Sequence, residues 1–281
     1  MKKFKKMVVP FTMAGMMILG NYSVYANDIS LSFIDEKVNE IEELIYEMDM
    51  VNDYQRSNFD NHINQLHIEA EEYFKNLDKL DDDDIKDMEL IIEKLDELDL
   101  KKMEVFEDKN RAVTWRAGDI LIYKTGSNNS NGEPSLTGHT AVLSDRESYV
   151  IEASKTVSNG AKVFHWHVSN LWDGASGIKQ YQVTSTLGTP ANSSEKQIAV
   201  DYGIKQVGKP YAIKTTLFTD EAWYCSKLTF RQWLQAGYDL RGAMSVVHPI
   251  YGILLVTPND IALDVNTRIY RDWDEELPTP L

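Results

Sequence analysis

Apolar residues recur at alternating spacings of three and four along residues 28–110, a stretch without glycine or proline. Such spacing is the seam of helices that pack as a bundle or a coiled coil. It predicts three antiparallel helices, at roughly 31–52, 55–79 and 83–107, with a turn at the acidic run 81–84. The seam positions are Ile34, Val38, Ile41, Ile45, Met48, Phe59, Ile63, Leu66, Ala70, Tyr73, Leu77, Leu80, Met88, Ile91, Leu95 and Leu98.

The pattern changes after residue 113 to short runs that alternate between apolar and polar residues. These runs predict strands at 118–124, 137–143, 148–154, 161–168, 178–184 and 251–256. One helix is expected to follow Ser194, with Gln197 completing a capping box, and to stop at 208–210. A second should run from about Tyr224 to Ala236 and end at Gly237. The predicted class is α+β, an antiparallel sheet or small barrel with helices on one side.

Residues 1–26 have the composition of a secretory signal peptide. Four lysines are followed by a mostly apolar run from Met7 to Leu19 and by small residues ahead of Asn27. The run is shorter than the ~20 residues of a membrane-spanning helix, so cleavage is favoured over an uncleaved anchor. We therefore expect a secreted or cell-surface protein whose mature chain begins near Asn27 and has no transmembrane segment.

Charge divides the remaining chain into two predicted domains. Residues 27–110 carry 27 acidic and nine basic side chains and form an acidic helical arm. Residues 111–281 are nearly neutral and form the second domain. The whole chain has a net charge of −15, which argues against nucleic acid as a partner.

Cys225 is the only cysteine, which excludes an internal disulfide and a cysteine-rich zinc site. It falls in the first turn of the helix predicted at 224–236, where the helix dipole and free N–H groups favour a thiolate. A nucleophile and a buried inert thiol both fit this position.

A thiolate nucleophile needs a base, and His139 lies in the strand TGHTAVL. If residues 144–147 form the hairpin loop, Leu143 faces Ser148 and His139 pairs directly with Glu152. Directly opposed side chains are close enough for a carboxylate–imidazole hydrogen bond that orients the ring. The alternative is an edge-strand histidine with a glutamate that faces solvent.

The other histidines give no convincing metal site, and no cofactor is expected. His62 and His67 are five residues apart and lie on different helix faces, at the surface or in the seam. His165 and His167 share one face of a strand but lack a third ligand. His248 precedes a proline and is assigned to a loop.

The order of His139, Glu152 and a helix-start Cys225 resembles the circularly permuted branch of the NlpC-type, papain-like cysteine hydrolases. The resemblance is closest to the YiiX-like bacterial group, with lecithin–retinol acyltransferases as distant relatives. It implies a papain-like core with Cys225 as nucleophile, His139 as base and Glu152 as the orienting residue. It also implies that Tyr211 and Tyr224 line the substrate cleft. The matching stretches are RAGDILIY (116–123), TGHTAVL (137–143), YVIEAS (149–154), VGKPYAI (207–213), WYCSKLTFRQWLQAG (223–237) and VTPNDIA (256–262).

These observations favour a secreted cysteine hydrolase that acts on an amide, with cell-wall peptide from peptidoglycan as the favoured substrate. Hydrolysis of a lipid ester or acyl transfer on the same fold stays open, because the cleft and not the triad decides the substrate. A non-catalytic adaptor also stays open, with the acidic arm binding a protein partner or a second copy of itself.

Overall fold

A computed structural model describes residues 31–47, 53–77, 82–106, 115–124, 138–156, 159–242 and 254–273. Its N-terminal part consists of three helices, α1 (Leu31–Glu47), α2 (Asp53–Lys75) and α3 (Asp82–Phe106). The three helices predicted from the apolar spacing are thus present. Most seam positions whose side chains are described are buried, whereas Tyr73 and Leu77 are half-buried. The buried ones are Ile34, Val38, Ile41, Ile63, Leu66, Ala70, Met88, Ile91, Leu95 and Leu98. The predicted leader and the predicted domain boundary at residue 110 lie outside the described residues.

The rest of the chain is built on a six-stranded antiparallel sheet, which confirms the α+β class. The strands lie in the order β4-β3-β2-β1-β5-β6. Their bounds are β1 (Ile120–Tyr123), β2 (His139–Leu143), β3 (Tyr149–Thr156), β4 (Gly160–His167), β5 (Lys179–Val183) and β6 (Thr267–Asp272). Five of them match predicted strands.

The sixth predicted strand, at 251–256, is not found where its residues are described. Residues 254–256 carry no strand pairing, and residues 251–253 lie outside the described part of the chain. Ser226 Oγ, in the first turn of α5, instead donates a hydrogen bond to the Val256 carbonyl oxygen at 2.8 Å. This segment is therefore bonded to the start of α5 and not to a strand. One edge of the sheet is formed by β6, which the sequence pattern did not predict.

Three helices accompany the sheet: α4 (Ser193–Ile204), α5 (Cys225–Gln235) and α6 (Pro258–Leu263), with a 3-10 turn η2 (Val168–Asn170) after β4. The capping box of α4 is formed by Asn192 and Glu195, so the predicted Ser194–Gln197 pair is wrong by two residues. The Asn192 side chain accepts from the backbone N–H groups of Ser194 and Glu195, at 2.9 and 3.1 Å. Helix α5 begins at Cys225 and is followed by Gly237 with φ 96°, as predicted.

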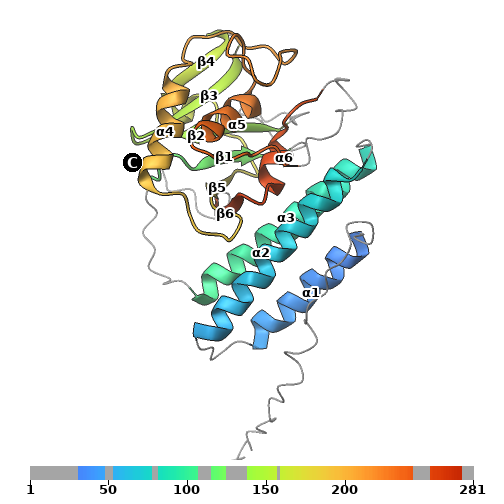
Figure 1. Cartoon of the computed structure of the whole chain (residues 1–281). Coiled ribbons are helices and arrows are strands. Elements are labelled where there is room, and N and C mark those ends of the chain that lie inside the picture. The colour runs from blue at the N-terminus through green and yellow to red at the C-terminus, as the bar shows by residue number, and fades with distance from the viewer. Residues whose placement is uncertain are drawn as a thin grey trace, which may run out of the picture.

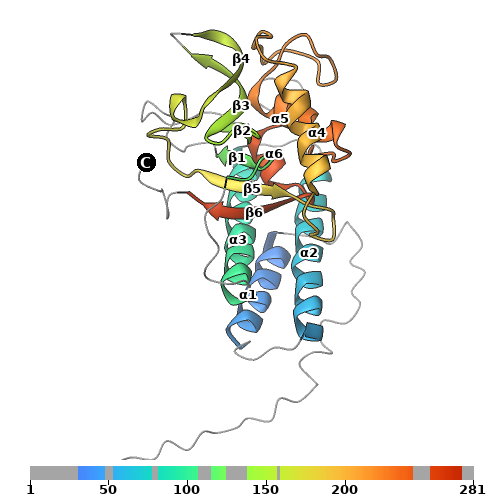
Figure 2. The ribbon, with the colours of Figure 1, turned by 90° about the vertical axis from the view of Figure 1, so that its left-hand side faces the viewer.

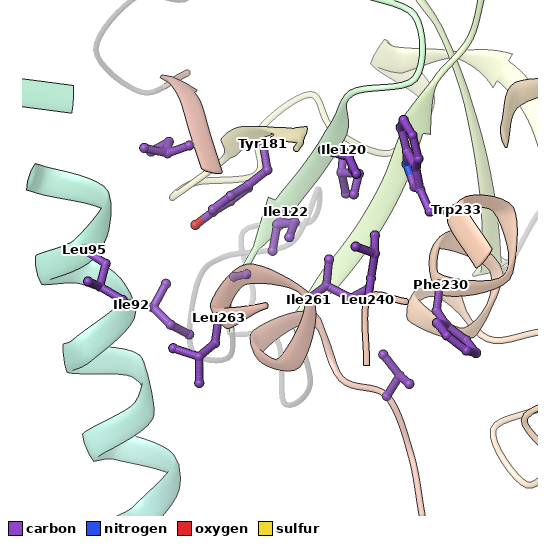
Figure 3. Close-up of a cluster of buried hydrophobic side chains, with 14 of the residues drawn as sticks. Ile92, Leu95, Ile120, Ile122, Tyr181, Phe230, Trp233, Leu240, Ile261 and Leu263 are labelled. Atoms are coloured by element: carbon purple, nitrogen blue, oxygen red, sulfur yellow. The ribbon is translucent and has the colours of Figure 1, made fainter. Parts of the chain in front are cut away.

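One continuous apolar core joins the arm to the sheet. Figure 1 shows α3 running beside α6 and the sheet. Leu95 and Ile92 of α3 lie beside Leu263 of α6, next to Ile122 of β1 (Figure 3). The same core continues to Trp233 and Phe230 of α5. The opposite face of the sheet has a separate apolar cluster that includes Leu121, Tyr123, Ala141, Leu143, Val150, Trp172 and Ile178.

Polar contacts also attach the arm, and they reach mainly β5, β6 and the turn before β6. Figure 2 shows β5 and β6 at the side of the sheet nearest the three helices. Asp96 accepts a hydrogen bond from Tyr181 Oη at 2.7 Å and pairs with Lys179 at 2.9 Å. Glu71 accepts from the Val265 backbone N–H at 2.6 Å, and Asn64 accepts from Arg268 at 3.2 Å. The arm therefore packs on the sheet through buried apolar and polar groups together.

Of the two arm histidines, His67 is buried and its Nε2 lies 3.1 Å from Asp99 Oδ2, whereas His62 is half-buried. This placement agrees with the expectation that they lie at the seam or the surface on different faces. None of the described helices is both long and apolar enough to cross a membrane.

Candidate active site

Cys225 is the first residue of α5, and its side chain is almost completely buried. The preceding residue, Tyr224, is the N-cap and makes no side-chain cap hydrogen bond among the described residues. The sulfur accepts hydrogen bonds from the His139 ring and the Thr140 backbone N–H, and the Ser226 hydroxyl lies 3.9 Å away. The thiol is thus held at a helix N-terminus against the first residues of β2.

His139 opens strand β2 and connects the cysteine to a carboxylate. Its Nε2 lies 2.5 Å from Glu152 Oε2. Because Nε2 is used by Glu152, Nδ1 is the ring nitrogen that remains for Cys225. The three residues chosen from the sequence therefore form one chain of contacts, carboxylate to imidazole to thiol.

The pairing of His139 with Glu152 is real, but the predicted register is wrong by two residues. Leu143 pairs with Val150 instead of Ser148. The hairpin loop begins one residue later than predicted, because the Ser144 N–H donates to the Tyr149 carbonyl at 2.8 Å. A shift of two residues keeps every side chain on its face of the sheet. His139 and Glu152 consequently meet as diagonal neighbours and not as directly opposed ones.

Two tryptophans that were not among the predicted site residues complete the surroundings of Glu152. Trp166 of β4 donates its indole N–H to Glu152 Oε1. Trp172, in the loop after η2, donates to Glu152 Oε2 at 3.2 Å. The available signal was the tryptophan between the two histidines of VFHWHV, but only the histidines have an obvious chemistry in sequence.

The electrostatics of the site favour a charged pair. Burial acts to lower the pKa of His139, but the contacts with Cys225 and Glu152 outweigh it and raise that pKa to about 10. Burial acts to raise the pKa of the Cys225 thiol, and the contact with His139 and the Thr140 N–H lower it below its usual range. The pair is therefore poised as thiolate and imidazolium near neutral pH.

Aromatic rings surround the imidazole. The His139 ring centroid lies 5.7 Å from that of Tyr123 and 5.4 Å from that of Trp172. Tyr224 is buried, and its hydroxyl accepts from the Val256 N–H at 3.3 Å. Tyr211 is half-buried and its backbone pairs with Trp223. Their assignment to the substrate cleft stays a prediction.

The other two described histidines of this half, His165 and His167, do not join the site. The His165 Nε2 lies 2.9 Å from Ser144 Oγ, and the His167 Nδ1 lies 2.8 Å from Ser169 Oγ. The Tyr149 ring packs edge-on against both imidazoles. His248 lies outside the described residues. Within the described ranges, no group of three histidine, cysteine or acidic side chains could hold a metal ion.

The arrangement is suited to nucleophilic catalysis at a carbonyl. A thiolate beside an imidazolium can attack a carbonyl carbon of the substrate. The same imidazolium can then protonate the group that leaves that carbon. The backbone N–H groups that open α5 are the available donors for a developing oxyanion.

Comparison with known proteins agrees with this chemistry. Residues 114–261, more than half of the chain, match the family described as permuted papain-like amidase enzymes, YaeF/YiiX, C92 family. Among solved structures, the chain is similar to the metalloprotein YiiX from Escherichia coli O157:H7, with 17% identity and a TM-score of 0.40. That similarity covers 56% of this chain and 97% of the other. No curated protein matches the chain.

Proposed function

We propose that this chain, which belongs to the permuted papain-like amidases and is a cysteine hydrolase, cleaves amide bonds of cell-wall peptide outside the cytoplasm. The observation that carries the proposed roles is the contact chain from Glu152 through His139 to Cys225. Secretion is supported by the leader-like residues 1–26, and the peptide substrate by the resemblance to NlpC-type hydrolases.

In the first half of the reaction, the Cys225 thiolate attacks the carbonyl carbon of the amide. The carbonyl π electrons move to oxygen, and the N–H groups at the start of α5 stabilise this oxyanion. When the tetrahedral intermediate collapses, the C–N bond breaks and the His139 imidazolium gives its proton to the departing amine. The acyl group is then held on Cys225 as a thioester.

In the second half, neutral His139 takes a proton from a water molecule as that water attacks the thioester. Collapse of the second intermediate breaks the C–S bond and releases the carboxylic acid. The thiolate and the imidazolium are restored together. Throughout, Glu152 holds Nε2 of the ring, so that Nδ1 stays directed at the sulfur.

The test is incubation of the protein lacking residues 1–26 with purified peptidoglycan, with Cys225→Ala as the matched control. We expect new soluble peptide fragments and new amino groups from the unsubstituted protein and none from the variant. Absence of release from peptidoglycan, with Cys225 still alkylated rapidly by iodoacetamide, would rule out the cell-wall substrate. A thiol that reacts no faster than free cysteine at neutral pH would instead favour the adaptor.

A further inference from the structure

The carboxylate of Glu152 receives more hydrogen bonds than its contact with His139 requires. Trp166 donates to Oε1, while Trp172, at 3.2 Å, shares Oε2 with the imidazole. Glu152 is 1% exposed, so these N–H groups replace solvent around the charge. A buried carboxylate is stable only when its lone pairs are satisfied in this way.

The two indoles come from separate parts of the chain. Trp166 lies in β4, opposite Val150 and diagonal to Glu152, and its ring stacks on that of Phe164 at 3.9 Å between centroids. Trp172 is buried in the loop that follows η2, with its ring edge-on to Tyr123 at 5.2 Å. Strand pairing places one indole and a surface loop places the other, yet both N–H groups converge on one side chain.

We propose that Trp166 and Trp172 are positioning residues for the catalytic pair, which they serve by fixing the carboxylate of Glu152. This inference rests on the proposed roles of Cys225, His139 and Glu152.

The physical reason is the freedom of a glutamate side chain. With only His139 as a partner, the carboxylate could rotate about its last bond and present either oxygen at a range of angles. A donor on Oε1 and a second donor on Oε2 fix the plane of the group. The ring of His139 is then fixed as well, with Nε2 held toward Glu152 and Nδ1 left for the sulfur.

Packing alone would not require tryptophan at these positions. A phenylalanine at either position would fill much of the same apolar space but would have no N–H group to donate. Phe164, directly opposite Glu152, shows that β4 accommodates a phenylalanine ring beside this carboxylate. Trp166→Phe and Trp172→Phe therefore remove the donor and retain an aromatic ring. Trp273→Phe is the matched control, because its indole also donates a hydrogen bond, to Gln180 Oε1 at 3.1 Å, away from Glu152.

The experiment measures the rate of iodoacetamide alkylation between pH 5 and 10, which reports the thiolate of the single cysteine. Each of Trp166→Phe and Trp172→Phe should lower the rate at pH 6 by about tenfold, the worth of one hydrogen bond to a charged group. All rates should converge above pH 9, where a thiol ionises without help. Trp273→Phe should follow the unsubstituted protein at every pH.

Three results would overturn the proposal. They are an unchanged pH profile in both variants, an equal loss at every pH, and the same loss in Trp273→Phe. If Trp172→Phe does not fold, Trp166→Phe alone tests the proposal. Trp166 is only half-buried on an edge strand of the sheet, so its replacement should be tolerated. Slow alkylation of the unsubstituted protein itself would refute the proposed function instead, so the two failures can be distinguished.

A double-mutant comparison tests whether the indole acts through Glu152. In the Glu152→Gln background, Trp166→Phe should cause little further loss at pH 6, because the charge that it orients is gone. Independent, multiplying losses in the double variant would show that Trp166 acts by another route.

Discussion

The Tyr181 hydroxyl in β5 donates a 2.7 Å hydrogen bond to the Asp96 carboxylate in α3, and both groups are buried. Burial and the neighbouring carboxylate raise the pKa of Tyr181 well above its usual range, so the phenol remains a donor. Asp96 also pairs with Lys179 at 2.9 Å. A single carboxylate thus connects the acidic arm to two residues of the sheet.

Asp96→Ala should lower the free energy of unfolding by about 1–3 kcal/mol, because it leaves the Tyr181 hydroxyl buried without its acceptor. Urea unfolding followed by tryptophan fluorescence measures the change. Asp83→Ala is the control, since the Asp83–Lys86 pair is exposed to solvent and should contribute nothing measurable. Equal midpoints for Asp96→Ala and the unsubstituted protein would show that the buried contact does not hold the arm.

Removal of residues 28–110 should produce an aggregating protein. The deletion would expose apolar residues that pack against α3, among them Leu263 of α6 (Figure 3). It would also leave Arg268 without the Asn64 side chain, which accepts its hydrogen bond. Size-exclusion chromatography of the truncated chain tests this. A monomeric truncated protein with normal Cys225 alkylation would show that the arm is dispensable for the fold of the hydrolase.

His139→Ala should reduce hydrolysis by about 10²–10⁴-fold, the usual contribution of a general acid–base residue. Glu152→Gln should cost less, because it keeps an acceptor for the ring and loses only the charge. Alkylation at pH 6 should fall in the same order, since both changes weaken the thiolate–imidazolium pair. A larger effect of Glu152→Gln than of His139→Ala would contradict the assigned roles.

Asp260→Asn should stabilise the protein at pH 8. Burial raises the pKa of Asp260 to about 7. A carboxyl whose pKa is raised on folding contributes stability at low pH, and this contribution is lost as the pH rises from about 4 to 7. The amide stays neutral and can still accept the 2.7 Å hydrogen bond from the Thr257 N–H.

Thermal unfolding of Asp260→Asn between pH 4 and 8 should accordingly show a flatter pH dependence than the unsubstituted protein. Asp239→Asn is the control, because Asp239 is partly exposed and pairs with Arg241 at the surface. A variant less stable at pH 8 would mean that Asp260 is ionised and needed as a charge.

The contact between His139 and Glu152 was predictable because side-chain alternation fixes the face of a strand even when the register is uncertain. His139 and Glu152 meet although the loop begins at Asp145 and not at Ser144, since the error is an even number of residues. The conformation of the loop between β2 and β3 depends on Ser148, which adopts a φ of 63°. Serine has no preference for this left-handed region, so the sequence did not predict it. The position of Cys225 in the first turn of α5 was also predictable from local rules, which placed a helix from about Tyr224 to Ala236 with Gly237 just after it.

The features that the sequence did not indicate depend on contacts between distant segments. Strand β6 contains Arg268 and Arg271 and lies at the edge, so it lacks the apolar alternation of a buried strand. Trp166 and Trp172 became visible as partners of Glu152 only once β4 and the following loop were placed. Local pattern contains no information on where a side chain from another element will point.

The attachment of the arm by β6 has a consequence for the order in which the chain can fold. Asn64 and Arg268, which hydrogen-bond to each other, are 204 positions apart, and Glu71 and Val265 are 194 apart. At the roughly 5–20 residues per second of ribosomal synthesis, the arm waits about 10–40 s for its partner strand. Its acidic helices must stay soluble through that interval, and a high density of like charge favours solubility. Contacts of such long sequence separation also close slowly, so the arm is made first but completed last.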